Sequence, residues 1–445
     1  MTNQLPDSEL RLPSETKTTF GLPRIGALTG VRWWAAFAVL LAHNVPGGST
    51  PAIVQSFFEQ GVYGVTVFFV LSGFILTVTY REGLSAPTPA KVWNFYVARF
   101  ARVYPLYLLV LLWVTPKKMT TIGAIFDETW LAHLFTIQAW FGVPFAFLWN
   151  GPGWTIGVEI FFYALFPLIV FLARKPLQTL RGSIGVTVAA AVVLIAEALL
   201  AEPTGWAMTA ATTVFPPLRL GDFVLGIGLA GIYMNARRDP RLERIGVWFI
   251  VTFLAVAAGF VVMRTFYFAT PGLNILYALP AGLLILGLAW TPDFWGTRWL
   301  ATRPMIVLGE ASYAFYLIHM SAGAYLNVGL LSEGFGKAST LLFVTGVVFV
   351  TAMAIGLNIM IESPARRAIR RWISVRKRTP KVEAAASTPG AASGAEPMGS
   401  DAEPGSSRAG TAAPHAAAAA PEPEAVTPGA EPAGSGAGVP QHRDV

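Results

Sequence analysis

Long apolar stretches that contain few charges recur along most of this chain. Two examples run from Trp154 to Ala173 and from Leu341 to Ile361. Each holds about the 20 residues that a helix needs to cross a hydrocarbon layer ~30 Å thick. Only 13% of the 445 residues are charged, about half the share that is usual in a soluble domain. A water-soluble core does not need so many stretches of this length, so the sequence predicts an all-α, polytopic membrane protein.

The apolar stretches predict about ten transmembrane helices that form a bundle in a lipid bilayer. An additional stretch over 130–149 is interrupted by His133, Gly142 and Pro144, and we interpret it as a partly embedded or re-entrant segment. The ten predicted spans cover 27–46, 60–80, 103–115, 154–173, 182–200, 212–235, 245–264, 274–291, 305–328 and 339–361.

The basic residues indicate how these spans are oriented. With the N-terminus inside, the inner loops and the end of the last span hold most of the arginines and lysines, whereas the outer loops hold few. Such an excess is typical of cytoplasmic loops. We therefore expect both termini to be cytoplasmic and the protein to lie in the plasma membrane. The net charge of +7 then reflects topology, and we expect no nucleic-acid partner.

The chain divides into three predicted regions. A cytoplasmic tail covers 1–25, a membrane domain covers 26–372, and a cytoplasmic tail that is first basic and then disordered covers 373–445. The second tail is rich in Ala, Pro, Gly, Ser and Glu and has no apolar periodicity. The chain has no cysteine, which excludes disulfides, thiol nucleophiles and thiolate metal sites. We expect no metal cofactor.

Arg32 and His43 lie within the first predicted span, where ionisable residues are costly and usually mark function. Their separation is close to three helical turns, which places them on one face and ~16 Å apart along the helix axis. A guanidinium at one depth and an imidazole at another suit a long ligand with a phosphate head. The alternative is an arginine that snorkels to the surface and a histidine that only packs.

Further polar residues are predicted to gather in the outer half of the bilayer, near His43. Arg219 and Asp222 are three residues apart, so they can pair on one helix face, or they can serve only to join helices. The candidate residues for this region are His43, Glu159, Arg219, Asp222 and His319, and Trp154 and Tyr313 are further candidates for lining the site.

Arg99 and Arg102 precede the third predicted span at the inner surface. Their spacing puts them on one helix face, where they would suit phosphate recognition. From spacing alone, ordinary positive-inside charge is the better explanation. Ser72 is a further candidate for lining the site, and with Gly73 it allows close helix packing. No base stands beside Ser72 in the sequence, which disfavours a serine nucleophile.

Several of these segments, taken in order, resemble acyltransferase family 3, the integral membrane O-acyltransferases of bacteria and some eukaryotes. The resemblance covers residues 24–372. Gly153 and Thr155 stand where serine is frequent in the family, and Asp222 stands where glutamate is common. The segments that carry the resemblance are Arg32-x10-His43, Gly64-Val-Thr-Val-Phe-Phe-Val-Leu-Ser-Gly-Phe74, Arg99-Phe-Ala-Arg102-Val-Tyr-Pro105, Asn150-Gly-Pro-Gly-Trp-Thr-Ile-Gly-Val-Glu159, Pro217-Leu-Arg-Leu-Gly-Asp-Phe223 and Leu308-Gly-Glu-Ala-Ser-Tyr-Ala-Phe-Tyr-Leu-Ile-His319.

The resemblance implies ten core spans and an acyl-CoA donor that binds from the cytoplasm. It also implies that His43 is the catalytic histidine and that Arg32, Arg99 and Arg102 help to hold the donor. Our hypothesis is that His43 acts as general base on the acceptor hydroxyl, because a neutral imidazole suits that work near pH 7. Glu159 would orient His43 or the hydroxyl. A path through an acyl-histidine intermediate stays open.

The predicted reaction moves an acetyl or other short acyl group to a hydroxyl of a carbohydrate or glycosylated acceptor. Cell-envelope glycans and macrolide-type natural products are both acceptors that the resemblance implies. Two alternatives come from other classes of protein. A multi-pass transporter of a sugar- or lipid-linked substrate would carry similar spans and buried charges but would consume no acyl-CoA. A non-catalytic membrane scaffold would tolerate exchange of Arg32 and His43.

Overall fold

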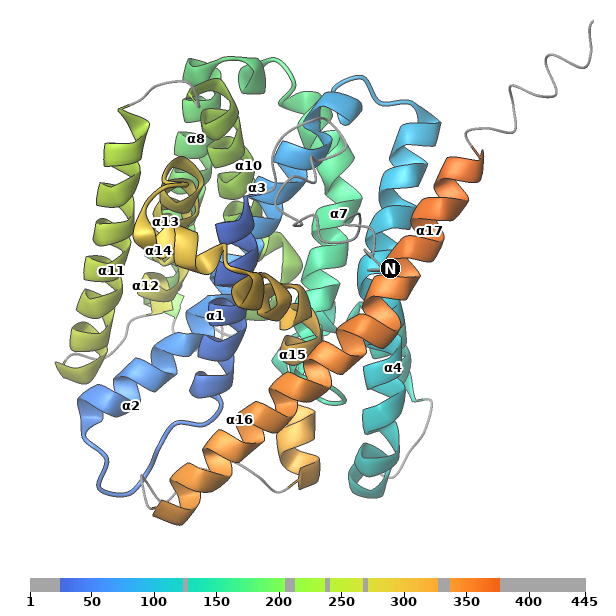
Figure 1. The fold of residues 1–445 in the computed structure, drawn as a ribbon, viewed down its shortest axis with the longest axis vertical. Coiled ribbons are helices and arrows are strands. Elements are labelled where there is room, and N and C mark those ends of the chain that lie inside the picture. The colour runs from blue at the N-terminus through green and yellow to red at the C-terminus, as the bar shows by residue number, and fades with distance from the viewer. Residues whose placement is uncertain are drawn as a thin grey trace, which may run out of the picture. The chain divides into compact units, whose positions relative to one another are not determined.

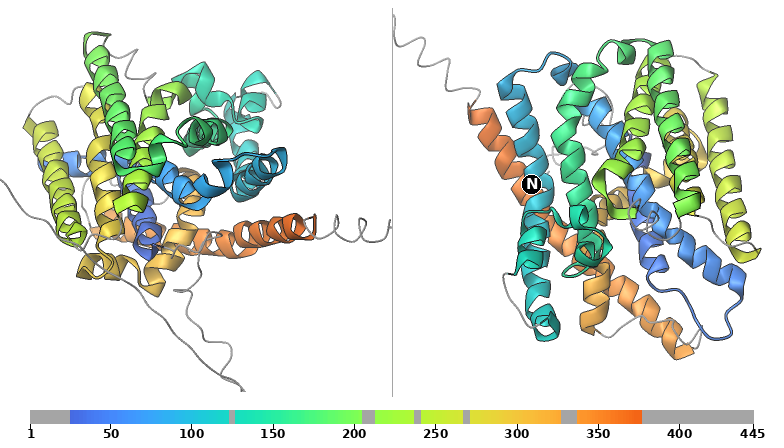
Figure 2. Two further views of the ribbon diagram at one scale, coloured as in Figure 1. Left: turned by 90° about the horizontal axis from the view of Figure 1, so that it is seen from above. Right: turned by 180° about the vertical axis from the view of Figure 1, so that it is seen from behind.

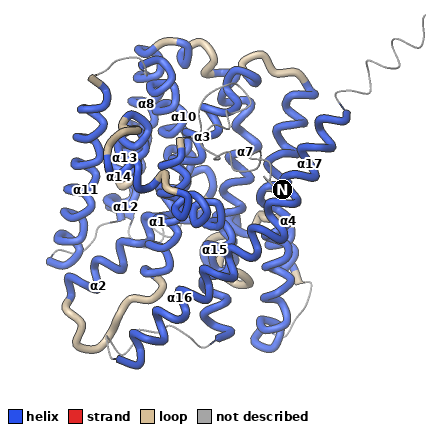
Figure 3. Tube along the Cα trace, in the orientation of Figure 1, coloured by secondary structure: helices blue, strands red, loops and turns tan. Residues whose placement is uncertain are grey.

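The computed structural model describes residues 25–122, 127–204, 213–236, 241–266, 271–326 and 337–376. Figure 1 shows most of the long helices running side by side, with their connections at the two ends of the bundle. Two further views show the same bundle from above and from behind (Figure 2). Within these described ranges there are helices and loops but no strand (Figure 3). The predicted all-α class is confirmed.

Among the residues that the structure describes, seven apolar helical segments are long enough to cross a membrane. Two shorter apolar segments, Gly26–Ala42 and Asn274–Trp290, accompany them. The composition of these segments supports a multi-pass membrane protein. The seven long segments are Ala52–Leu84, Pro89–Pro116, Gly151–Leu172, Leu180–Ala201, Pro216–Ala236, Leu242–Phe266 and Ser339–Ile369.

Each of the ten predicted spans overlaps a helix, although some bounds differ. The predicted span 103–115 is too short, because helix α4 runs without interruption over Pro89–Ile122 and so includes Arg99 and Arg102. The predicted span 274–291 is divided at Tyr277 between α12 (Pro271–Leu276) and α13 (Ala278–Trp290). That all ten cross the bilayer, with both termini in the cytoplasm, stays a prediction.

Helix α1 (Gly26–Ala42) packs closely between α3 (Gly64–Leu84) and α15 (Arg303–Leu326). Gly64 and Gly309 face its backbone, and a Cβ at either position would overlap a carbonyl oxygen of α1. Small residues allow this approach, which is typical of helix contacts in membranes. The two glycines therefore fix the helix that carries Arg32 and ends next to His43.

Helix α10 (Leu220–Ala236) packs against α3 and α8 (Leu180–Thr204). Gly73 of α3 faces the carbonyl oxygen of Phe223, and Gly226 of α10 faces that of Val70, so that neither position has room for a Cβ. The close packing that the sequence predicts at Gly73 is confirmed. This contact holds α10 against the same helix that lines the candidate site.

The segment before α7 (Trp154–Leu172) is broken into short helices, among them α5 (Glu128–Leu134) and α6 (Val143–Ala146). The backbone φ is positive at Thr136 and Gly142, where the chain changes direction. The side-chain amide of Gln138 donates to the carbonyl oxygen of Gly153, 2.8 Å away. The predicted interruption of 130–149 is confirmed, whereas its depth in a membrane stays a prediction.

The remaining helices that the structure describes are the C-terminal pair and three others. Helix α16 (Lys337–Leu357) continues through a π-helical turn over Asn358–Glu362 into α17 (Ser363–Arg376). Together these helices run at a slant across one face of the bundle (Figures 1 and 2). Most of the two predicted tails lies outside the described residues. Of the tail over 1–25 the structure describes only the last residue, and of the tail over 373–445 only the part up to Arg376. The other helices are α2 (Ala52–Glu59), α11 (Leu242–Phe266) and α14 (Trp295–Leu300).

Candidate active site

Two histidines that are far apart in the sequence meet beyond the last turn of α1, which His43 directly follows. The ring centres of His43 and His319, which lies in α15, are 5.1 Å apart. His43 Nδ1 lies 2.8 Å from the carbonyl oxygen of Val39 and 3.3 Å from His319 Nε2. His319 Nδ1 lies 2.6 Å from the carbonyl oxygen of Tyr316. The two imidazoles and two backbone carbonyls thus form one hydrogen-bonded chain.

This chain determines where the protons lie when both rings are neutral. A carbonyl oxygen can only accept, so Nδ1 carries the proton in each ring. His319 Nε2 then has a lone pair that accepts from His43 Nδ1–H, which it shares with Val39. His43 Nε2 has a lone pair and no hydrogen-bond partner in the part of the chain that the structure describes. His43 is exposed whereas His319 is buried, so His43 Nε2 can act as a base.

His43 lines a cavity of about 180 Å³, which we call the histidine cavity. Its wall combines aromatic rings with a few polar groups, as small-molecule sites usually do. The predicted residues His43, Trp154 and Arg219 all lie in it. Its main lining side chains are His43, Tyr63, Thr66, Trp154, Arg219, Asn274 and Tyr316.

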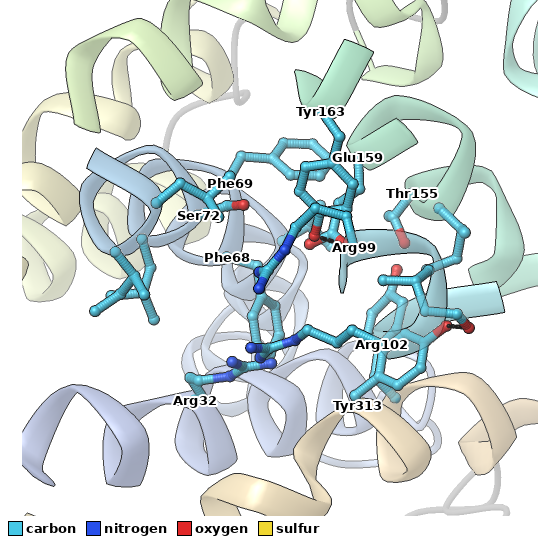
Figure 4. Close-up of a pocket in the computed structure, with 17 residues that line it drawn as sticks. Arg32, Phe68, Phe69, Ser72, Arg99, Arg102, Thr155, Glu159, Tyr163 and Tyr313 are labelled. Carbon is cyan, nitrogen blue, oxygen red and sulfur yellow. Dashed lines mark hydrogen bonds between the residues drawn. The ribbon is translucent and has the colours of Figure 1, made fainter. Parts of the chain in front are cut away.

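A second cavity, of about 70 Å³, is lined by three arginines, and we call it the arginine cavity. Arg32 comes from α1, and Arg99 and Arg102 come from α4. Figure 4 shows the three guanidinium groups pointing toward one another at the centre of the cavity. The structure therefore brings together the three residues that were predicted to hold a phosphate-bearing donor. Ser72, Glu159, Tyr163 and Tyr313 also line this cavity.

The arginine cavity holds more positive charge than negative charge. Arg32 and Arg102 repel each other, and Glu159 and Glu362 attract both of them. Glu159 Oε2 also accepts a hydrogen bond of 3.0 Å from the Tyr163 hydroxyl. With Arg99 included, three guanidinium groups face two carboxylates. A bound anion would restore the balance of charge inside the protein.

Hydrogen-bond donors in the arginine cavity also favour a bound anion. The buried Nε atoms of Arg32 and Arg99 have no hydrogen-bond partner within the described ranges. One terminal nitrogen of Arg99 donates to the Tyr80 hydroxyl, 2.8 Å away, which orients its guanidinium group. A buried donor without a partner costs free energy, of the order of 1–3 kcal/mol. A ligand with several phosphate oxygens would satisfy these donors.

The two cavities adjoin, because Val65 and Tyr316 line both of them. Arg32 and His43 are on one face of α1, as their spacing predicts, and each lines a different cavity. A ligand that binds the arginines at one end can therefore extend along α1 toward the imidazole.

The predicted pair of Arg219 and Asp222 is confirmed. One terminal nitrogen of Arg219 lies 2.7 Å from Asp222 Oδ2 and donates to the Thr66 hydroxyl, 2.9 Å away. Arg219 and Asp222 are buried, and their pair joins α10 to α3 through Thr66. The pair connects two helices, and Arg219 also lines the histidine cavity. Both roles that the sequence suggested for the pair, in the site and in joining helices, are therefore compatible with the structure.

Glu159 lies apart from the residues with which the sequence grouped it. Glu159 follows Trp154 by five residues, which turns it by about 140° and moves it ~7.5 Å along α7. It therefore lines the arginine cavity, while Trp154 lines the histidine cavity. Tyr313 also lines the arginine cavity, and its hydroxyl donates to the Val103 carbonyl oxygen, 2.8 Å away. The side chain that contacts His43 is His319.

Sequence reasoning missed three residues of the site. Glu362 is buried at the π-helical turn and attracts the arginines electrostatically. The signal for it in the sequence is its position as the carboxylate that ends the last apolar stretch. Tyr163 lies one turn after Glu159, where its hydroxyl could be expected to reach the carboxylate. Asn274 begins an apolar span and has no local signal that links it to His43.

An imidazole base next to a cation-rich cavity, inside a bundle of apolar helices, is an arrangement suited to the integral membrane acyltransferases. The chain belongs to acyltransferase family 3, because the acyltransferase-domain profile of that family matches residues 25–361. This range includes all residues that line the two cavities.

Similar proteins occur in several bacteria. The chain is 30% identical over 392 residues to acyltransferase MdmB of Streptomyces mycarofaciens, covering 78% of this chain and 93% of that protein. It is 26% identical to the exopolysaccharide production protein ExoZ of Rhizobium meliloti, over 70% of this chain and 91% of the other. It is 22% identical to O-acetyltransferase OatA of Staphylococcus aureus, over 76% of this chain and 57% of the other. No solved structure matches the chain.

Proposed function

We propose that this protein transfers an acetyl or other short acyl group from acyl-CoA to a hydroxyl of a carbohydrate or of a glycosylated small molecule. The observation that carries the proposal is His43 Nε2, which has no hydrogen-bond partner among the described residues and faces a cavity that adjoins the arginine cavity. The relatives support the same chemistry, since one is named an O-acetyltransferase and another an exopolysaccharide production protein.

The arginine cavity would bind the phosphates of the donor. Guanidinium groups make paired, charge-assisted hydrogen bonds to phosphate oxygens, and Arg32, Arg99 and Arg102 converge on one point (Figure 4). The pantetheine arm would pass Val65 and Tyr316, which both cavities share. The thioester would then lie within reach of His43, ~16 Å along the axis of α1 from Arg32.

The proposed reaction has two proton transfers. His43 Nε2 takes the proton of the acceptor hydroxyl while the hydroxyl oxygen attacks the thioester carbonyl carbon. The carbon–sulfur bond of the tetrahedral intermediate then breaks. The proton on His43 passes to the sulfur, which leaves as the free thiol of CoA, and the ester remains on the acceptor. His43 ends in its starting state.

His319 would stabilise the charged form of His43 during this cycle. When Nε2 is protonated, His43 becomes an imidazolium whose Nδ1–H faces the lone pair of His319 Nε2 and the Val39 carbonyl oxygen. Hydrogen bonds to a charged group contribute about 1.5–3 kcal/mol. The proton on Nδ1 of His319 is held by the Tyr316 carbonyl, which keeps the lone pair directed at His43.

The proposed topology has ten spans in the plasma membrane, with both termini in the cytoplasm. The α3–α4 and α7–α8 connections lie at the same end of the bundle, and α17 runs toward that end (Figure 1). The basic residues Arg81, Arg174, Lys175 and Arg181 are at or next to these connections. Their position at one end supports a cytoplasmic assignment for it.

The decisive experiment uses the full-length protein in lipid nanodiscs with acetyl-CoA, and it measures the release of the CoA thiol. We expect His43→Ala to lower this rate by about 100- to 10,000-fold, the usual contribution of a general base. His133→Gln is a matched control, because His133 lines neither cavity and glutamine keeps a donor for the carbonyl that His133 contacts. Near wild-type thiol release by folded His43→Ala would overturn the proposal.

A further inference from the structure

We infer that the histidine cavity is the acceptor subsite and that it selects a neutral pyranose ring. This inference rests on the proposed function and adds the position of the acceptor, its charge and the size of the ring that reacts. Four observations carry it: the aromatic wall, the orientation of Asn274, the balance of charge and the size of the cavity.

The aromatic wall of the histidine cavity is held rigidly. The ring of Tyr63 stacks on that of Tyr277, with 4.2 Å between centroids and 13° between planes, and Phe260 packs edge-on against both. Trp154 and Tyr316 complete the wall. A pyranose has C–H groups on its faces that pack against aromatic rings, while its hydroxyls point outward from the ring edge. The wall therefore suits a sugar face.

Asn274 supplies hydrogen-bond donors to the same space. The Tyr63 hydroxyl donates to Asn274 Oδ1, which fixes the orientation of the side-chain amide. The two protons on Nδ2 have no acceptor within the described ranges, and Asn274 lines the cavity. An amide with an assigned orientation can donate to a sugar hydroxyl or ring oxygen. Asn274 thus provides a directional contact that an apolar ligand would leave unused.

The charge of the histidine cavity is balanced. Among its described lining residues, Arg219 is the one with a fixed charge, and Asp222 lies 2.7 Å from it. An acidic sugar would bring a carboxylate into a buried site with no unpaired cation to meet it, and this is costly. The arginine cavity has the opposite character, with an excess of positive charge. The contrast favours a neutral acceptor beside His43.

The size of the cavity fits one ring. The volume of about 180 Å³ is many times the ~15 Å³ that one buried water needs, so the cavity has room for a group of the size of a sugar ring. A hexopyranose has a dozen non-hydrogen atoms. One of its hydroxyls can lie at His43 Nε2 while the ring lies against the aromatic wall. The remainder of a larger acceptor would lie outside the cavity.

The first test compares two acceptor probes that differ in charge. Full-length protein in nanodiscs receives acetyl-CoA with octyl β-D-glucopyranoside or octyl β-D-glucuronide, and mass spectrometry measures the acetylated product. We expect kcat/KM to be at least tenfold higher for the glucoside. Equal rates, a preference for the glucuronide, or His43-dependent use of acetyl-CoA without acetylation of either probe would overturn the inference. A wild-type protein that consumes no acetyl-CoA would instead overturn the proposed function.

The second test removes the amide. We expect Asn274→Ala to raise the KM for the glucoside about fivefold to tenfold, with the KM for acetyl-CoA within twofold of wild type. Tyr63→Phe should have a smaller effect in the same direction, because the amide remains but is less well oriented. Asn94→Ala is the matched control, since Asn94 lines neither cavity. An unchanged KM for the glucoside in Asn274→Ala, with normal use of acetyl-CoA, would refute the assignment.

Discussion

The arginine cavity and the histidine cavity share Val65 and Tyr316, yet they differ in almost every property that decides what a cavity binds. The arginine cavity has three guanidinium groups, fewer carboxylates and buried donors that lack partners in the described part of the chain. The histidine cavity pairs its arginine with a carboxylate and presents an imidazole lone pair. One is suited to an anion and the other to a neutral polar ligand that reacts with a base.

This difference indicates a division of work along one helix. Arg32 belongs to α1 and His43 directly follows the last residue of this helix, but each lines a different cavity. Binding energy from the anionic end of a donor can thus be used to position its reactive end, which is a general way for an enzyme to lower a barrier. Substitutions in the arginine cavity should therefore affect the kinetic constants for the donor, and substitutions in the histidine cavity should affect those for the acceptor or the rate of the chemical step.

Among the changes that distinguish the two cavities by their effects on KM, the largest expected effect comes from the arginine cavity. We expect Arg102→Ala to lower kcat/KM for acetyl-CoA about 100-fold, because a charge-assisted hydrogen bond is worth up to about 3 kcal/mol. The KM for the glycoside acceptor should change less than twofold. Steady-state kinetics with each substrate varied in turn measures both values.

Arg102→Lys provides the comparison for this variant. Lysine keeps the charge but not the forked geometry of the guanidinium group, so we expect it to recover part of the loss. The separation between the cavities is contradicted if Arg102→Ala raises both KM values by similar factors while the protein remains folded.

Local periodicity made part of this site predictable. The shared face of Arg32 and His43 follows from the helical repeat alone, as does the pair of Arg219 and Asp222. The grouping of Glu159 with His43 used only depth along a span. Depth gives no information about which face of α7 a side chain occupies, or about which helix stands opposite that face.

The contact between His43 and His319 needed the folded structure. The two residues are 276 positions apart in the sequence, and Gly309 allows the close approach of α15 to α1 that brings them together. Glu362 was overlooked because a carboxylate at the end of an apolar stretch resembles an ordinary helix boundary. The all-α class was predictable because a helix is one of the few structures that pair all backbone N–H and C=O groups inside a lipid bilayer.

A smaller effect is expected at the contact between the histidines. We expect His319→Ala to lower kcat about tenfold and to leave both KM values within twofold of wild type, because one hydrogen bond to the charged form of His43 is lost. His319→Gln should recover part of the rate where its amide oxygen accepts from Nδ1–H of His43. A change in either KM without a change in kcat would instead assign His319 to substrate binding.

The smallest expected effect needs no mutation and compares the cavities directly. Salt screens charge over ~10 Å at 0.1 M and ~3 Å at 1 M, so we expect the KM for acetyl-CoA to rise about threefold over this range. The arginine cavity attracts an anion and should lose part of that attraction, whereas the charge of Arg219 is already paired with Asp222. The KM for octyl β-D-glucopyranoside should therefore stay nearly constant in the same titration. Parallel changes in the two constants would show that the cavities do not differ in charge toward their ligands.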